Sequence, residues 1–286
     1  MSVVRTNYGE LRGVQGEGCA AFLGIPFARP PVGELRFRAP QPPDPWSGVR
    51  EATATAPTAP QVVNEELQAL LPSAPEEQDE DCLYLNVFTP AADGGKRPVM
   101  VWIHGGAFTQ GSGSSPMYDG SRLARRGDVV VVTTNYRLGA LGFLCLEGDD
   151  GGEEPFTNFG MLDQIAALRW VRTEISTFGG DPENVTIFGE SAGGMSVGAL
   201  MASPLASGLF RRAIPQSGAG HNALSVDTAR SVASRFARAI GAGTPTREAL
   251  AGIEVSRILE VQAQLEAELM SAMEEGGPAE MRFQPV

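Results

Sequence analysis

The chain has 286 residues, of which 42% are hydrophobic and 20% are charged, a composition typical of a globular protein with a substantial core. Its formal net charge of −12 argues against nucleic acid and anionic membrane surfaces as partners. No segment approaches the roughly 18 consecutive apolar residues of a membrane span. The N-terminus shows no basic region followed by an apolar stretch, so we expect no membrane association and no secretory signal.

The first 81 residues predict short strands followed by irregular chain. Residues 2–28 read as two or three strands separated by glycines, whereas residues 29–81 are rich in proline and are expected to wrap the surface, with one helical turn near 65–71. Two acidic runs, 76–81 and 147–154, are expected to be solvated loops.

Strands alternate with helices in the rest of the chain. Strands are predicted at 83–88, 98–104, 129–135, 185–188 and 212–216, and helices at 158–178, 191–203 and 256–275. A further helix is expected to start with Asp227 as its N-cap. This alternation predicts an α/β fold with a largely parallel central sheet. Because no internal repeat or linker is visible, we expect residues 1–286 to form a single domain.

The cysteine content indicates the redox environment. Cys19, Cys82 and Cys145 are odd in number, so at least one thiol is unpaired, and their spacing does not suggest a disulfide framework. We therefore expect a reducing compartment and a cytoplasmic protein.

A G-x-S-x-G motif spans Gly189 to Gly193, between the predicted strand 185–188 and the helix that follows it. This context predicts a sharp turn that holds Ser191 in a strained conformation and presents its hydroxyl alone. The start of the helix places backbone N–H groups and a partial positive charge near the hydroxyl. Ser191 is therefore the candidate nucleophile, and the alternative is a glycine-rich turn with an uninvolved serine.

A second glycine motif, His104-Gly105-Gly106, ends the predicted strand 98–104. Glycines let the backbone approach a bound ester and turn its N–H groups toward one point. With the N–H of Ala192, those of Gly105 and Gly106 would form an oxyanion hole with three donors. The alternative is an ordinary turn after a strand, which the presence of Ser191 makes less favoured.

With these motifs the sequence resembles the type-B carboxylesterase and cholinesterase-like family of α/β-hydrolases. Further matching blocks are Phe22–Ala28, Pro30–Gly33, Glu80–Val87, Asn135–Gly139, Asn158–Gln164, Phe178–Pro182 and Gln216–Gly218. The resemblance runs from near residue 8 to about residue 220 in the family's order. It implies an α/β-hydrolase fold and a serine carboxylesterase that hydrolyses small carboxylic esters through an acyl-enzyme on Ser191. No cofactor is implied, and two histidines without an H-E-x-x-H pattern argue against a catalytic metal.

The resemblance also implies roles for residues around the nucleophile. Glu190 is usually buried in this family and supports the turn, and Ser217 would lie near the triad as a supporting residue. Cys82 is paired with an upstream cysteine in secreted relatives. Residues 56–62, where that partner is expected, contain no cysteine, which supports a free thiol.

The sequence does not supply a complete triad. A serine nucleophile needs a base, and in this fold the acid and the histidine follow the serine. His104 precedes Ser191, and residues 192–220 contain no Asp or Glu that could serve His221. His221 is therefore interpreted as a pocket-lining or surface residue, and its use as base with an acid from elsewhere is the alternative.

Residues 282–286 resemble the start of a family block that continues further. We therefore expect the domain to be incomplete at its C-terminus, with the triad acid and base beyond Val286 in a missing segment or chain. Two alternatives to an esterase stay open: a catalytically inactive truncated product, and a non-catalytic cholinesterase-like interaction protein.

Overall fold

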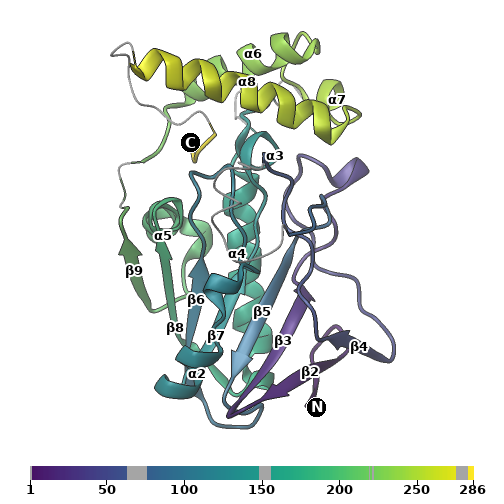
Figure 1. The fold of residues 1–286 in the computed structure, drawn as a ribbon, viewed down its shortest axis with the longest axis vertical. Coiled ribbons are helices and arrows are strands. Elements are labelled where there is room, and N and C mark those ends of the chain that lie inside the picture. The colour runs from purple at the N-terminus through teal and green to yellow at the C-terminus, as the bar shows by residue number, and fades with distance from the viewer. Residues whose placement is uncertain (1, 63–75, 148–155, 219, 221, 275–282) are drawn as a thin grey trace.

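A mixed sheet organises the protein, whose computed structural model describes residues 2–62, 76–147, 156–218, 220, 222–274 and 283–286. In the described chain the sheet has nine strands in the order β1-β2-β3-β5-β7-β6-β8-β9, with β4 beside β2 (Figure 1). The strands are β1 (Val3–Arg5), β2 (Glu10–Gly16), β3 (Cys19–Pro26), β4 (Val49–Ala52), β5 (Tyr84–Thr89), β6 (Arg97–Ile103), β7 (Val130–Thr134), β8 (Gly180–Glu190) and β9 (Arg212–Gln216).

The direction of the strands divides the sheet. Along β1-β2-β3-β5-β7 each strand is antiparallel to the next. The strands β7, β6, β8 and β9 are parallel to one another. The carboxyl ends of parallel strands meet at one edge, where α/β proteins place their sites. The predicted strands after residue 81 are all present, but β8 begins at Gly180 rather than near 185. Its first residue pairs with Arg97, and a register shift precedes the rest of the ladder.

Helices cover both faces of the sheet and its upper edge. They are α2 (Ser121–Gly127), α3 (Gly139–Phe143), α4 (Phe159–Glu174), α5 (Ala192–Ala202), α6 (Val226–Ile240), α7 (Arg247–Leu250) and α8 (Val255–Glu274), with 3₁₀ turns η1 (Gly33–Leu35), η2 (Pro116–Tyr118), η3 (Ile175–Phe178) and η4 (Pro204–Ala206). Figure 1 shows α2 in front of the sheet and α4 behind it. It also shows α6, α7 and α8 together as a helical layer above the sheet, far from the N-terminus.

The longer helices follow the sequence predictions, and the short ones do not. The expected helix 158–178 is α4 followed by η3, and Gly179 ends it in the left-handed conformation with φ 83°. Helices α2, α3 and α7 were not predicted because four to seven residues are too few to show a helical period. The expected turn at 65–71 and most of the run 147–154 lie outside the described residues.

The N-cap prediction for α6 was wrong. Ser225 caps the helix, since its Oγ accepts the N–H of Thr228 at 3.1 Å. Asp227 lies inside the first turn, where a carboxylate interacts favourably with the positive end of the helix dipole.

The solvated-loop prediction was wrong for one residue of the first acidic run. The side chains of Glu80 and Arg36 are only 13% and 11% exposed, and Arg36 Nε donates to Glu80 Oε1 at 2.7 Å. Arg36 also donates to the carbonyls of Ala251 and Ile253, between α7 and α8 of the helical layer. This ion pair therefore ties the proline-rich segment to that layer.

The core lies mainly between the sheet, α4, α5 and the helical layer. All five residues of β7 are buried, as the run of valines predicted. A smaller cluster of Cys19, Phe88, Ala124 and Val131 fills the space under α2.

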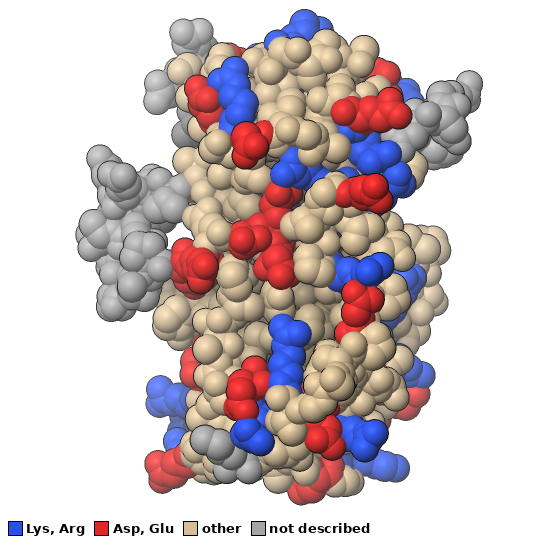
Figure 2. Space-filling model, turned by 90° about the vertical axis from the view of Figure 1, so that its right-hand side faces the viewer, with Lys and Arg blue, Asp and Glu red and all other residues tan. Residues whose placement is uncertain are grey.

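The surface carries charges of both signs. Acidic and basic side chains are interspersed on the face in Figure 2, with acidic residues gathered across its middle. Among the described residues, none of the helices is both long and apolar enough to cross a membrane.

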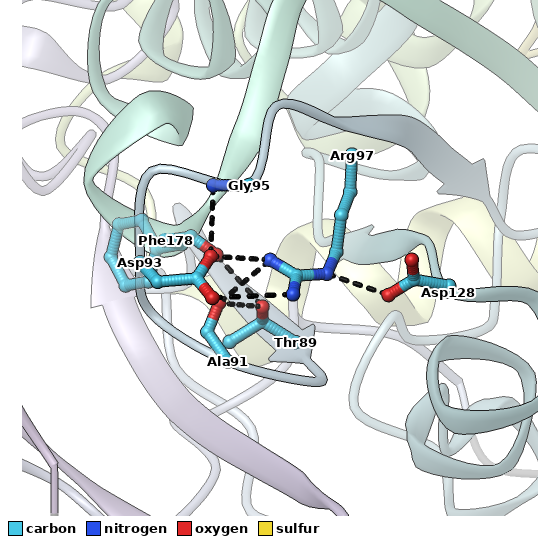
Figure 3. A network of polar contacts seen from close by, with 7 residues as sticks. All are labelled: Thr89, Ala91, Asp93, Gly95, Arg97, Asp128 and Phe178. Carbon is cyan, nitrogen blue, oxygen red and sulfur yellow. Dashed lines mark hydrogen bonds and ion pairs between the residues drawn. The ribbon is translucent and has the colours of Figure 1, made fainter.

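A polar network closes the lower end of the parallel strands (Figure 3). Arg97, the first residue of β6, donates to Asp128 at 2.7 Å and to Asp93, and its N–H bonds the carbonyl of Gly179 at 2.9 Å. Beside it, the buried hydroxyl of Thr89 contacts the carbonyls of Phe178 at 2.7 Å and Ala91 at 3.0 Å. These contacts join β5, β6 and the turn before β8.

We expect Thr89→Val to lower the free energy of unfolding by about 1–2 kcal/mol, because the shape is kept while the buried hydroxyl bond to the carbonyl of Phe178 is lost. Chemical denaturation measures this change. Thr177→Val is the matched control, since its hydroxyl bonds the carbonyl of Arg5 in an exposed position. Equal effects of the two substitutions would contradict a special role for Thr89.

Candidate active site

Ser191 lies at the junction of β8 and α5 in a strained conformation. Its backbone has φ 58° and ψ −123°, outside the regions that non-glycine residues usually adopt. The N–H of Ser191 donates to the carbonyl of Gln216 in β9 at 2.9 Å, and its own carbonyl accepts the N–H of Met195 at the same distance. Such strain costs of order 1–3 kcal/mol and persists only where the surroundings hold it.

The glycines around Ser191 allow backbones to touch. We call residues 189–194 the elbow. A Cβ on Gly193 would lie 2.0 Å from the carbonyl oxygen of Ile103, and one on Gly189 would lie 2.6 Å from the same oxygen. A Cβ on Gly194 would lie 2.5 Å from the carbonyl oxygen of Gln216. Glycine is therefore required on both sides of the serine, because the elbow packs directly on the ends of β6 and β9.

The second glycine motif lies against the elbow. We call residues 104–111 the oxyanion loop, after its proposed role. A Cβ on Gly105 would lie 3.2 Å from Ser191 Cβ and 2.5 Å from the carbonyl oxygen of Glu190. Ala192 is the first residue of α5, so the helix itself leaves its N–H without a partner. The structure thus places Gly105 against Ser191, beside the start of α5.

The oxyanion loop has three consecutive residues with positive φ. They are Gly106 at 112°, Ala107 at 53° and Phe108 at 62°. A Cβ on Gly106 would meet the carbonyl oxygen of Gln110 at 2.1 Å, so this position requires glycine. Phe108 is fully buried and packs edge-on against Phe143 at 5.0 Å between ring centroids.

His104 supports the oxyanion loop from inside the protein. Its buried ring stacks on Tyr136 with centroids 4.4 Å apart, and Nδ1 donates to the carbonyl of Gly105 at 2.8 Å. The Tyr136 hydroxyl donates to the carbonyl of His104 at 2.9 Å. Burial lowers the pKa of His104 to about 4, against the opposing effect of the bond to Gly105. The imidazole is therefore neutral at pH 7, with its Nδ1 proton committed to the loop.

One supporting residue differs in its exposure from the expectation. Glu190 was expected to be buried, but it is exposed at the end of β8. The reason is its place beside β9, which in the described chain is the last strand of the sheet and is mostly exposed. Burial raises the pKa of Tyr118, and the negative charge of Glu190 raises it further.

Ser217 follows β9 with φ 52° and is exposed. The next residue, Gly218, touches the elbow, since a Cβ there would lie 2.6 Å from the carbonyl oxygen of Ser191. Ser217 is therefore next in the chain to a residue that touches Ser191, although it is distant from Ser191 in the sequence. His221 lies outside the described residues.

The cysteines and possible metal ligands complete the inventory of reactive groups. Cys19, Cys82 and Cys145 are all free and buried. Burial raises the pKa of each thiol, so none is poised as a nucleophile. The cytoplasmic location stays a prediction. In the described ranges, no three His, Cys, Asp or Glu side chains are grouped to hold a metal.

The fold and the site together place the chain among known proteins. The sequence profile of the carboxylesterase family matches residues 1–286. The chain belongs to the carboxylesterase family. It is 48% identical to the para-nitrobenzyl esterase of Bacillus subtilis (strain 168) over 263 residues, which are 92% of this chain and 53% of that protein. It is 46% identical to the acetylcholinesterase of Gallus gallus, covering 83% of this chain and 32% of that protein.

Solved structures of carboxylesterases superpose on this chain. The match to a Geobacillus stearothermophilus carboxylesterase has a TM-score of 0.86 at 49% identity and covers all of this chain and 55% of that one. A thermophilic PNB esterase gives 0.88 at 46% identity, with 99% and 56% covered. The α/β-hydrolase fold implied by the resemblance is therefore confirmed. The chain spans about half the length of these relatives.

Sequence reasoning missed several residues that shape this carboxylesterase-family site. Tyr136 was noted only as part of a family block, and the strain at Ala107 and Phe108 was not foreseen. A positive φ at alanine or phenylalanine leaves no signal in a sequence, because both residues are common in every regular structure. The hydroxyl of Tyr136 finds its partner only through the pairing of β6 with β7.

We expect the stability of the chain to fall with pH between 6.5 and 4 in a way that depends on His104. In this window the unfolded imidazole binds a proton and the native one does not, so stability is lost as pH falls and levels off below pH 4. The full contribution is about 3 kcal/mol, with a slope of at most about 1.4 kcal/mol per pH unit. Chemical denaturation at pH 6.5, 5.75 and 5 should show a steeper loss for wild type than for His104→Gln. Parallel curves would contradict a neutral, buried His104.

We expect Gly193→Ala to disrupt the elbow, because its Cβ would meet two backbone carbonyls, those of Ile103 and His104. Neither can move without shifting β6, so the melting temperature should drop by several degrees, on the scale of a lost core contact. Gly252→Ala, where a Cβ meets nothing within 4 Å, is the control in the same thermal scan. A melting temperature unchanged in both would show that the elbow has room for a side chain.

Proposed function

We propose that this chain provides the nucleophile and the oxyanion hole of a serine esterase that hydrolyses small uncharged carboxylic esters. The observation that carries the proposal is the strained Ser191, held against Gly105 at the start of α5. Such strain is retained at sites where geometry serves chemistry. The membership in the carboxylesterase family supports the same reaction class.

The proposed reaction proceeds through an acyl-enzyme. Ser191 Oγ attacks the ester carbonyl carbon, and the carbonyl π electrons move onto oxygen. The N–H groups of Gly105, Gly106 and Ala192 stabilise this oxyanion, a contribution worth about 10²–10³ in rate for each donor in comparable sites. Collapse of the intermediate expels the alcohol, and water then releases the acid from Ser191.

A base must take the proton of Ser191, and the described residues place none beside it. His104 is neutral, but its ring is buried and its Nδ1 is bound to Gly105. The proposal assigns the base histidine and its acid partner to polypeptide beyond Val286, as the sequence analysis expected. The domain formed by residues 1–286 would then need that segment, in the same chain or another, for full activity.

We expect a fluorophosphonate probe to label wild type and the control Ser207→Ala, whose serine is exposed and remote from the elbow, and not to label Ser191→Ala. The reason is that, among the serines that the structure describes, the proposal places Ser191 beside anion-stabilising N–H groups. Mass spectrometry of the labelled peptide after a long incubation measures the result. Equal labelling of Ser191→Ala would remove this residue from the mechanism.

The turnover of a short-chain p-nitrophenyl ester separates the proposal from its alternatives. Without a base, the 286-residue chain should show only the roughly 10³–10⁴-fold rate over water that an oxyanion hole and binding retain. No labelling and no rate above water would favour an inactive product or a non-catalytic interaction protein. A far higher rate that Ser191→Ala abolishes would show that the base lies within residues 1–286.

A further inference from the structure

The oxyanion loop cannot hold its own conformation. Ala107 and Phe108 both have left-handed backbones, which cost each non-glycine residue of order 1–3 kcal/mol. Something outside the loop must therefore select this conformation. The contacts of Phe108 identify it: its carbonyl accepts the N–H of Gly139 at 2.7 Å, and its ring packs on Phe143. Both partners belong to α3, whose two ends thus hold the loop.

The start of α3 is in turn held by α8. Gln262 is buried in α8, and its Oε1 accepts the N–H of Ala140 at 2.9 Å. Its Nε2 donates to Glu266 Oε1 at 3.1 Å, which sets the amide so that the oxygen faces α3. The fit leaves no spare room, since a Cβ on Gly139 would lie 2.0 Å from Gln262 Oε1.

The two hydrogen bonds meet at adjacent residues. The first N–H groups of a helix have no partner within it and must find one elsewhere. In α3 the N–H of Gly139 is satisfied by the oxyanion loop and that of Ala140 by Gln262. If Gln262 lost its acceptor, Ala140 would keep a buried N–H without a partner. The start of α3 would then shift so that this N–H finds another acceptor, and the hydrogen bond from Gly139 to the carbonyl of Phe108 would move with it.

We propose that Gln262 is a positioning residue for the oxyanion hole, acting through the first turn of α3. The inference rests on the proposed function of the loop. Because Gln262 belongs to α8, the helical layer gains a role in the chemistry. The contact joins distant parts of the chain, since Gln262 lies 122 residues from Ala140. Gln262 touches no reacting atom, so its effect should be confined to the tetrahedral state that the oxyanion donors recognise.

The segment before α3 has a second support, so removing the Gln262 contact should not unfold it. Arg137 forms a buried ion pair with Asp163 of α4, with Nε and Nη2 at 2.8 and 2.7 Å from its two oxygens. The Arg137 N–H also donates to Asp163 at 3.0 Å. Gln262→Met, which keeps the length of the side chain and removes the acceptor, therefore tests positioning rather than folding.

The test compares two ligands of the 286-residue chain, an aryl trifluoromethyl ketone and the matching aryl methyl ketone. Ser191 Oγ adds to the trifluoromethyl ketone: the Oγ–C bond forms, the C=O π pair moves to oxygen, and the hydroxyl proton leaves to solvent. The hemiketal oxyanion then occupies the oxyanion hole and has its own ¹⁹F NMR signal. The methyl ketone stays planar and reports binding without the tetrahedral state.

We expect Gln262→Met to raise the Kd of the trifluoromethyl ketone about tenfold, because small misplacements of catalytic groups carry effects of this size or larger. The Kd of the methyl ketone, from saturation-transfer NMR, should stay unchanged. Gly139→Ala displaces the Gln262 amide and also strains a residue with φ 54°, so it should likewise raise the Kd of the trifluoromethyl ketone more than that of the methyl ketone. Gln264→Met, on the exposed face of α8, should leave both Kd values as in wild type.

The outcomes separate this inference from the proposed function. A hemiketal signal that is absent in wild type, or present in Ser191→Ala, removes the nucleophile and the inference with it. A signal that depends on Ser191 but has the same Kd in Gln262→Met overturns the inference alone. Equal losses for both ketones in Gln262→Met and Gly139→Ala would also overturn it, since they would show a merely structural role.

Discussion

The direct contact between the elbow and the end of β6 is the constraint on which the site depends. Side chains would separate these backbones, and the glycines at 189, 193 and 194 remove them. The contact brings the start of α5 to the oxyanion loop, so that a helix N-terminus and a strand end share one small volume. A nucleophile at this point meets the positive end of the helix dipole and unpaired N–H groups at once.

The close approach of the elbow and the oxyanion loop requires strained backbone conformations, and contacts from the rest of the fold hold those conformations. Ser191, Ala107 and Phe108 have positive φ values that each oppose folding. Buried side chains supply the compensation: the Tyr136 hydroxyl anchors the β6 end of the loop, and the Phe108–Phe143 contact anchors its outer part. The supports come from elements on different sides, which is why the loop has one defined conformation rather than several.

Two ion pairs link the layers that provide these supports. Arg137–Asp163 joins the end of β7 to α4, and Arg36–Glu80 joins the proline-rich segment to the chain between α7 and α8. Removing such groups from water is costly, so their value lies in fixed geometry rather than in net stability. Each arginine also bonds backbone or several carboxylate atoms, which defines both the distance and the orientation of the elements it joins.

The amino-acid sequence by itself determined the parts of this protein that depend on local pattern. Most strands, the long helices and Ser191 in its glycine turn could be predicted, because period and tight turns leave traces in neighbouring residues. The strand β4 was missed, since it lies in the proline-rich segment that we expected to be irregular. The glycine pair after β6 was also recognisable, since glycine pairs after a strand are a local feature. The prediction of the α6 N-cap failed because Ser225 and Asp227 are both good capping residues. Which of them caps the helix depends on where the helix meets the layer beneath it.

Only the tertiary structure decided which side chains support the site and which are exposed to solvent. Glu80 is largely shielded from solvent because Arg36 reaches it from another segment, and Glu190 is exposed because β9 is the last described strand of the sheet. Gln262 lies on an amphipathic helix where a buried glutamine looks like any other polar residue. Its proposed role depends on the hydrogen bond with Ala140. Only folding brings these two residues together, so no local pattern in the chain predicts that bond.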